Sequence, residues 1–419
     1  MSIDYANGDK TDTIELRKDN LSEALQGLPR QMALALRAVT LLKKGSIELT
    51  VPGGRTFTYS GELPGPHGVA TLNNWRLPRR VITAGSLGVS EGYLAGDWDS
   101  PDVTAFLELF LVNGTESGTE QFFDRGRFLK WLTTIHHWFN RNTKKGSKRN
   151  IAAHYDLGNA FYEQWLDPSM TYSSAWYGDG ANSLEDAQEA KYRSLSTLCD
   201  IKPDHHVLEI GCGWGGFAEH VAGRIGAKIT CLTISQEQYD YAQARMQRLG
   251  LNDKVTIKFQ DYRDETGTYD RIGSIEMFEA VGAKYWDTYF QKLHDCLKPQ
   301  GKAGVQVITI RNEDFEGYRD NPDFIQKYIF PGGMLPSDRI MEDLGPKNRL
   351  SLVDSLSFGH DYGETLAQWR ERFWAAWPSI EPLGFDERFK RMWEYYLHYC
   401  EAGFRTNGID VRQMIYQRG

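Results

Sequence analysis

An acid and three alternating glycines stand together in residues 205–220, which read HHVLEIGCGWGGFAEH. The apolar residues around Glu209 predict a buried strand, and Gly211, Gly213 and Gly215 allow a tight turn that a ligand can approach closely. The helix expected next offers unpaired N–H groups to a ligand carboxylate, while Glu209 can bind a ligand ammonium or the amides of the loop. The segment therefore predicts a site for a ligand that carries both groups.

A carboxylate next to an ammonium is the amino-acid end of S-adenosylmethionine (SAM), which this segment favours. A dinucleotide is the alternative, because residues 213–216 offer a variant of G-x-G-x-x-G. That site usually has an acid at the tip of the second strand. The strand expected at 228–232 is instead followed by Thr233-Ile234-Ser235-Gln236. A glycine turn that merely closes a strand–helix unit remains the plain structural alternative.

Length and composition set the broad class of the protein. The chain has 419 residues, enough for two or three domains, and its net charge of -8 argues against a general nucleic-acid binder. Its 5 cysteines are scattered without a C-x-x-C pair, which argues against structural zinc and fits a reducing compartment. The polar start does not resemble a secretory signal, and no apolar stretch approaches the roughly 18–20 residues of a membrane span. We expect a cytoplasmic protein without a metal site.

The patterning predicts an α/β fold in three parts. Residues 1–118 form an N-terminal α+β domain, 119–150 a basic and aromatic linker, and 151–419 the catalytic domain. The first domain is expected to hold helices at 31–42 and 102–112 and a hairpin of strands at 46–51 and 56–59. The catalytic domain is expected to be a doubly wound, mostly parallel sheet with ligands at the carboxyl ends of its strands. Its strands are expected at 207–210, 228–232, 255–259, 271–275 and 303–310, followed by aromatic helices over 364–400.

Further motifs follow one another in a distinctive order. They are HYDLGN at 154–159, LDPSMTYSSA at 166–175, EIGCGWG at 209–215, LTISQEQ at 232–238, MFEAVG at 277–282, YIFPGGMLPS at 328–337 and DY at 361–362. With these motifs the chain resembles the cyclopropane-fatty-acyl-phospholipid synthase family, which includes proteins like the mycolic-acid cyclopropane synthases. The resemblance runs from about 154 to 402, and more faintly through a lipid-carrier-like N-terminal domain.

The resemblance implies a class I SAM-dependent methyltransferase fold and a transferase of lipid biosynthesis. The activity implied is transfer of a methylene from SAM across a cis double bond of phospholipid acyl chains. An alternative is a SAM-dependent fatty-acid methyltransferase that gives a methyl-branched or methylene product. A lipid-binding or scaffold protein with an inactive SAM fold is a third hypothesis. The implied partner is unsaturated phospholipid, met by peripheral contact at the inner face of the membrane, and the family is often dimeric.

The resemblance also implies which residues bind the cofactor. Tyr172 and Ser173 precede the sheet, Thr233 and Gln238 lie near the ribose, and Asp261 and Tyr262 follow the third strand, near the adenine. With the first-strand acid and the glycine loop, the expected SAM site comprises Tyr172, Ser173, Glu209, Gly211, Gly213, Gly215, Thr233, Gln238, Asp261 and Tyr262.

The base implied by the resemblance is a bicarbonate ion. The residues implied to hold it are Ser174, Glu279, Gln306, Ile308 and Tyr362. Ser174 stands where many members have cysteine, and Gln306 stands where many have histidine. Both residues keep hydrogen-bonding capacity, but Gln306 cannot take up a proton near neutral pH. A buried Glu279 beside an anion should have a raised pKa and share a proton.

Rings and basic groups alternate over residues 122–149, which end in the basic run from Arg141 to Arg149. Such a segment suits contact with anionic lipid headgroups. The alternative is a solvated linker.

Overall fold

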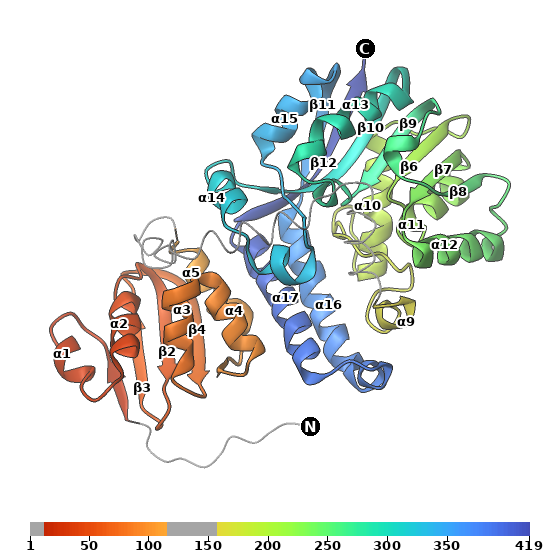
Figure 1. Cartoon of the computed structure of the whole chain (residues 1–419). Coiled ribbons are helices and arrows are strands. Elements are labelled where there is room, and N and C mark those ends of the chain that lie inside the picture. Colours follow the sequence, from red (N-terminus) through yellow and green to blue (C-terminus); the bar gives the residue numbers. More distant parts are fainter. Residues whose placement is uncertain (1–11, 115–156) are drawn as a thin grey trace. The chain divides into compact units, whose positions relative to one another are not determined.

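The structure, a computed structural model, describes residues 12–114 and 157–419. These residues divide into two units (Figure 1). The first unit contains the described residues up to 114 together with Asp386–Thr406, and the second contains those from 157 to Phe385 together with Asn407–Gly419. The sequence-based boundaries differ from this division, because they placed the segment 386–406 in the catalytic domain.

A five-stranded mixed sheet organises the first unit, with strand order β1-β3-β2-β4-β5. β2 pairs antiparallel with β3, which confirms the expected hairpin, and parallel with β4. The strands are β1 (Thr13–Glu15), β2 (Lys44–Thr50), β3 (Thr56–Ser60), β4 (Leu63–Leu72) and β5 (Trp98–Asp99). The helices are α1 (Leu21–Ala24), α2 (Arg30–Val39), α3 (Arg76–Ala84), α4 (Ser86–Leu94), α5 (Val103–Leu111) and α17 (Glu387–Arg405).

Helix α17 belongs to the first unit because its side chains bond to α4 and α5. Thr104 Oγ1 lies 2.6 Å from His398 Nδ1, and the Tyr93 hydroxyl donates to Glu394 at 2.9 Å. The ring centroids of Tyr93 and Tyr395 are 5.5 Å apart. The aromatic side chains of α17 therefore contribute to the core of the first unit.

A seven-stranded sheet organises the second unit, with strand order β11-β12-β10-β9-β6-β7-β8. Its strands are β6 (His206–Ile210), β7 (Lys228–Thr233), β8 (Val255–Phe259), β9 (Tyr269–Ile275), β10 (Leu297–Ile310), β11 (Leu350–Ser357) and β12 (Ile409–Arg418). The first five are the strands expected from sequence, and they pair in parallel. β12 pairs antiparallel with β10 and β11, so the sheet is mostly parallel, as expected.

Helices connect these strands and cover both faces of the sheet. They are α9 (Asn159–Tyr162), α10 (Leu184–Leu198), α11 (Gly216–Glu219), α12 (Gln236–Leu249), α13 (Trp286–Cys296), α14 (Phe315–Asp320), α15 (Asp338–Lys347) and α16 (Gly359–Ile380). Short 3₁₀ turns are η3 (Tyr262–Asp264), η4 (Phe278–Ala280), η5 (Ala283–Tyr285) and η7 (Glu381–Leu383). Two π-helical turns are η2 (His220–Ile225) and η6 (Ile325–Ile329).

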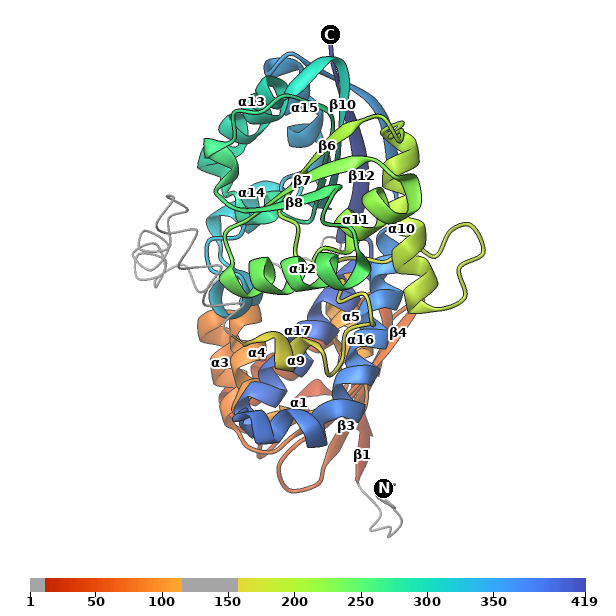
Figure 2. The same ribbon diagram turned by 90° about the vertical axis from the view of Figure 1, so that its right-hand side faces the viewer.

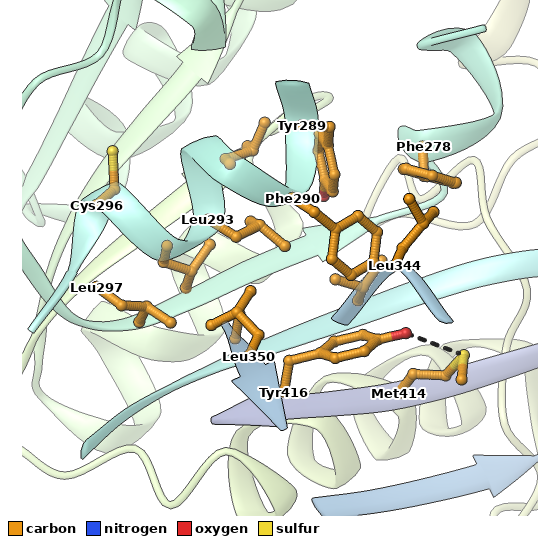
Figure 3. Packing of buried hydrophobic residues seen from close by; sticks show 14 of the residues in the cluster. Phe278, Tyr289, Phe290, Leu293, Cys296, Leu297, Leu344, Leu350, Met414 and Tyr416 are labelled. Atoms are coloured by element: carbon orange, nitrogen blue, oxygen red, sulfur yellow. Dashed lines mark hydrogen bonds between the residues drawn. The ribbon is translucent and has the colours of Figure 1, made fainter. Parts of the chain in front are cut away.

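The core of the second unit lies on both faces of the sheet. Successive side chains of a strand alternate between faces, so Leu208 joins the cluster under α13 and α15, while Val207 joins the cluster under α10, α11 and α12. Figure 2 shows the two helical layers on opposite sides of the strands. In Figure 3, Phe290 and Leu293 of α13 meet Tyr416 of β12 and Leu350 of β11. This two-sided packing fixes the strand ends that carry the candidate site.

Candidate active site

The carboxyl ends of the parallel strands collect the polar residues predicted for the site. Glu209 lies near the end of β6, Thr233 ends β7, and Asp261 follows β8. Gln306 lies in β10, and β10 pairs with the end of β9 through Gln306 and Ile275. Because these strands are parallel, their carboxyl ends meet at one edge of the sheet, where α/β proteins bind ligands.

The glycine loop after β6 needs glycine for its conformation. Gly211, Gly213 and Gly215 have φ values of 83°, 49° and 87°, in the left-handed region that other residues rarely adopt. A Cβ atom at Gly211 would lie 2.7 Å from Cγ of Met277, whereas one at Gly213 would meet nothing within 4 Å. Gly211 is therefore also required by packing, and Gly213 leaves its backbone open to a ligand.

Glu209 supplies an unpaired buried oxygen beside this loop. The residue is 3% exposed, and its Oε2 has no hydrogen-bond partner within the described residues. Burial raises the pKa of Glu209 to about 8. A ligand ammonium would satisfy this oxygen and favour the ionised carboxylate. Together with the open loop, Glu209 fits the amino-acid end of SAM.

The residues predicted near the ribose form a short network at the end of β7. The Thr233 hydroxyl donates to Gln238 Oε1 at 2.9 Å and accepts from the Ser235 backbone N–H at 3.2 Å. Both Thr233 and Gln238 are buried. The hydrogen bond fixes the orientation of the Gln238 amide, while a direct contact with a ribose stays a prediction.

The residues predicted near the adenine lie at the start of η3, after β8. Both oxygens of Asp261 accept from the Arg263 guanidinium, Oδ1 from Nε at 2.8 Å and Oδ2 from Nη2 at 2.6 Å. The Tyr262 ring lies 5.5 Å from the ring of Tyr289 in an edge arrangement. Arg263 therefore compensates the charge of Asp261, and Tyr262 contributes an aromatic surface.

Aromatic rings connect the glycine loop with helix α16. The ring centroids are 5.0 Å apart for Trp214 and Tyr162, 5.4 Å for Tyr162 and Tyr172, and 5.3 Å for Tyr172 and Trp369. Trp369 then lies 6.1 Å from Tyr362. The predicted cofactor residue Tyr172 and the predicted catalytic residue Tyr362 are thus joined by continuous ring contacts.

Ser173 is tied to a buried lysine that the sequence analysis did not single out. Lys191 Nζ donates to the Ser173 hydroxyl and to Gln188 Oε1, both at 2.6 Å. Lys191 is fully buried, and burial lowers its pKa to about 7. Its position seven residues after Leu184, on the buried stripe of α10, is the signal that could have identified it.

Glu276, immediately after β9, receives hydrogen bonds from three of the residues predicted to hold bicarbonate. Its Oε1 accepts from the Ser174 backbone N–H at 2.8 Å and from Gln306 Nε2 at 2.9 Å. Its Oε2 accepts from the Tyr362 hydroxyl at 2.6 Å. Burial raises the pKa of Glu276, although these three donors act in the opposite direction.

Glu279 lies one turn further along, in η4, and has fewer partners. Its Oε1 accepts from the Ile308 backbone N–H at 2.6 Å, and its buried Oε2 has no hydrogen-bond partner within the part of the chain described. Its backbone carbonyl accepts from the Met334 N–H at 2.9 Å, so the YIFPGGMLPS loop holds it in place. Burial, and then the charge of Glu276, raise the pKa of Glu279 to about 8. The expected rise is present, and the neighbouring charge is Glu276.

The predicted catalytic residues therefore gather around two carboxyl groups. Ser174, Gln306 and Tyr362 meet at Glu276, and Ile308 meets Glu279. Ser174 contributes its backbone N–H, because its hydroxyl donates to the Ala175 carbonyl at 2.8 Å. Glu276 itself was missed, although an acid directly at the end of the fourth parallel strand was a signal in the sequence.

Two predicted segments fall partly or wholly outside the described residues. These are the first half of HYDLGN, 154–156, and the basic and aromatic segment 122–149. The second half of HYDLGN reaches the glycine loop, because the Trp214 indole donates to Asn159 Oδ1 at 2.7 Å.

Comparison with known sequences places this chain among lipid-modifying enzymes. Residues 142–414 match the family described as mycolic acid cyclopropane synthetase. The cyclopropane-fatty-acyl-phospholipid synthase of Escherichia coli K12 is 38% identical over 383 residues, covering 89% of this chain and 96% of that protein. The tuberculostearic acid methyltransferase of Mycobacterium tuberculosis is 39% identical over 349 residues, covering 80% of each.

Solved structures agree with this placement. The cyclopropane synthase MmaA2 from Mycobacterium tuberculosis is 27% identical, with a TM-score of 0.61, and the match covers 65% of this chain and 98% of that chain. The mycolic acid cyclopropane synthase CmaA1, complexed with SAH and CTAB, matches with the same identity, coverage and TM-score. The second unit therefore has the class I SAM-dependent methyltransferase fold. The chain is an enzyme of the mycolic acid cyclopropane synthetase family.

Proposed function

We propose that this enzyme is a cyclopropane-fatty-acyl-phospholipid synthase, which transfers a methylene from SAM across a cis double bond of phospholipid acyl chains. The observation that carries the proposal is the pair of half-buried, hydrogen-bonded carboxyl groups, Glu276 and Glu279, at the same sheet edge as the glycine loop. The relative from Escherichia coli, matched over nearly its whole length, supports the same activity.

The reaction sets demands that the described residues can meet. An isolated alkene is a weak nucleophile, and its attack on a methyl group leaves a carbocation-like lipid. When bound, SAM supplies an electrophilic methyl group on a sulfonium centre. Glu209 and the loop after β6 would hold the amino-acid end of SAM, and Thr233, Gln238, Asp261 and Tyr262 would form the nucleoside side of the site.

Aromatic faces can stabilise the positive charge that develops on the lipid. A cation over a ring gains about 0.5–1 kcal/mol when exposed and about 2 kcal/mol or more when desolvated. Tyr172 and Trp369 belong to the ring series that links the glycine loop to Tyr362, next to Glu276. We propose that this series lies along the path of the acyl chain.

The bicarbonate ion that the family resemblance implies does not fit the donors present. Ser174, Gln306 and Tyr362 already donate to Glu276, and the Ile308 N–H donates to Glu279. No step of the proposed reaction is therefore assigned to bicarbonate.

The lipid product tests the proposed function. Phospholipids from cells expressing the enzyme should gain the mass of one CH₂ group, and the modified chain should have lost its double bond. Ozonolysis should then fail to cleave that chain. A retained olefin beside the new carbon would instead support the fatty-acid methyltransferase, the second candidate, which is favoured by the 39% identity to tuberculostearic acid methyltransferase. No SAM turnover on unsaturated vesicles would contradict both.

We also propose peripheral contact with the inner face of the membrane, because the substrate chains lie in a bilayer. Within the described residues, no helix is long and apolar enough to cross a bilayer. The basic run in the undescribed segment includes Lys144, Lys145, Lys148 and Arg149. Neutralising these four residues should weaken sedimentation with anionic vesicles, whereas neutralising four exposed basic residues elsewhere should not. Light scattering during size exclusion tests the homodimer that the family resemblance implies.

A further inference from the structure

We propose that the Glu276 carboxylate accepts the proton released during ring closure, in place of a bound bicarbonate ion. This inference rests on the proposed cyclopropane synthase function.

Ser174, Gln306 and Tyr362 form a cage of hydrogen-bond donors around Glu276. Their hydrogen bonds to Glu276 are those that an anion in this cage would need. One oxygen accepts from the Ser174 N–H and the Gln306 amide, and the other accepts from the Tyr362 hydroxyl, at 2.6–2.9 Å. A separate carboxylate-like ion would have to take these donors from Glu276 and bring another negative charge beside Glu279. Both changes are unfavourable in a buried site. The side chain therefore occupies the position of the ion.

The backbone at Glu276 supports a specific role for this residue. Its φ of 48° lies in the left-handed region, which is unfavourable for a residue with a Cβ. Such strain persists where the surroundings fix the residue, and it is concentrated at functional sites. Here the Glu276 N–H also donates to the Gln306 carbonyl at 2.8 Å. Glycine would avoid the strain but would leave the cage without its carboxylate.

The two carboxyl groups differ in the charge state that their partners favour. Among the described residues, Glu276 accepts three side-chain hydrogen bonds, which favour its ionised form. Glu279 accepts one there, and its Oε2, which has no partner among them, can carry a proton. Lys191 contributes a favourable charge interaction with Glu276, and Tyr362 contributes its hydroxyl. A single proton shared by the pair thus resides on Glu279, and Glu276 is the available base.

The proposed step balances with the residues named. As the C–S bond breaks, its electron pair stays on sulfur, and the alkene π pair forms the first new C–C bond. Glu276 then removes a proton from the transferred methyl group, and the C–H electron pair forms the second C–C bond. The proton remains on the Glu276 carboxyl group until product release, when water accepts it.

The test compares Glu276→Gly with Glu276→Gln in the full-length enzyme, in CO₂-depleted buffer with and without added bicarbonate. Wild-type turnover should not depend on bicarbonate. Both variants should lose roughly 100-fold or more, as expected for loss of a general base. Bicarbonate should restore at least roughly a tenth of the wild-type rate to Glu276→Gly, which has room for the ion. It should not restore Glu276→Gln, whose amide fills the cage.

A binding measurement provides a readout that does not depend on turnover. Without SAM or lipid, bicarbonate should raise the melting temperature of Glu276→Gly in a saturable way and leave the wild type unchanged, because a ligand stabilises only the folded state that binds it. Gln300→Gly is the matched control, since exposed Gln300 also has a positive φ, 63°, at the start of β10 away from the cage. It should give no bicarbonate effect.

Bicarbonate-dependent wild-type turnover, or full activity of Glu276→Gln, would overturn the proposal. So would a Glu276→Gly protein that neither binds bicarbonate nor regains activity. Failure of the proposed function can be distinguished from failure of this inference. If the wild type formed an olefinic or methyl-branched lipid, the product analysis would show it. The bicarbonate binding test would still show whether Glu276 fills the anion position.

Discussion

At the residue scale, the site contains two neighbouring acids, and ionising both of them costs more free energy than ionising one. Glu276 and Glu279 are half-buried and three positions apart, and the charge of Glu276 contributes to the raised pKa of Glu279. Hydrogen-bond donors are divided unequally between them. Because burial raises the pKa of both groups, the unequal hydrogen bonding favours ionisation of Glu276 over ionisation of Glu279.

The raised pKa of Glu279 makes stability depend on pH. Its folded-state value of about 8 lies above its ordinary value of 4.5, so the folded protein binds the proton more tightly than the unfolded chain. This contribution to stability is fully present below the ordinary value and is lost as the pH rises through about 8. Relative to Glu279→Gln, the wild type should therefore lose melting temperature with rising pH across this interval. Parallel melting curves for the two proteins would contradict this protonation state.

Replacing Tyr362 with Phe tests the charge state of Glu276. The Tyr362 hydroxyl lowers the pKa of Glu276, so its removal should raise that pKa while the ring still packs against Trp369. Because the base acts when deprotonated, the acidic limb of the kcat/KM profile should move to higher pH. Tyr416→Phe is the matched control, since it removes a buried hydroxyl that donates to the Met341 carbonyl in the sheet core. An unshifted Tyr362→Phe profile would argue against Glu276 as the base.

At the element scale, the glycine loop joins a strand to a helix and leaves its backbone accessible. Gly213→Ala should cost about 1–2 kcal/mol of stability through its positive φ, with no clash from the new methyl group. The methyl group would enter the space beside the loop and should weaken SAM binding at least roughly tenfold, about 1.4 kcal/mol. Calorimetric titration of SAM measures this loss.

Gly250→Ala provides the control for this prediction. Gly250 follows helix α12, has a φ of 68° and would also accept a Cβ in open space. Both substitutions therefore carry a similar backbone cost. SAM affinity should fall only in Gly213→Ala, and an equal fall in both would mean that the loop effect is general destabilisation.

The elements were more predictable from sequence than their partners in space. The expected strand 255–259 coincides with β8, because a short apolar run between polar turns specifies a buried strand. β12 was missed, because its pairing with β10 joins segments about a hundred residues apart and leaves no local signal. The same reason explains why the packing partner of α17 was not predicted. Its aromatic stripe predicts a packed helix but does not indicate that the helix packs on α5.

The site shows the same division between local and distant information. The motif containing Gly211 and Glu209 predicted both the loop and the acid beside it, because both lie in one short segment. The cage was only partly predictable. Gln306 and Tyr362 were expected around an ion, whereas the structure places the Glu276 side chain between them. Sequence alone could not indicate that the anion is part of the chain, because this requires the end of β9 and helix α16 to meet.

At the scale of the whole molecule, the first unit is built from two distant parts of the chain. Residues 12–114 supply its sheet, and α17 supplies a helix from beyond most of the catalytic fold. The buried Thr104 hydroxyl bonds to His398 at 2.6 Å and to Glu401 at 3.2 Å. If these contacts make one cooperative unit, a substitution that destabilises α5 should also lower the local stability of α17.

Thr104→Val tests this cooperativity in the full-length protein. Valine keeps the shape but removes the hydroxyl, which should cost about 1–3 kcal/mol, because buried His398 and Glu401 each lose a hydrogen bond. In hydrogen exchange, amide protection should fall together in α17 and in strands β2 and β4, while α16 and β6 keep theirs. SAM affinity should not change. Protection lost from α17 and α16 alike, with β2 unaffected, would instead mean that α17 unfolds with the catalytic unit.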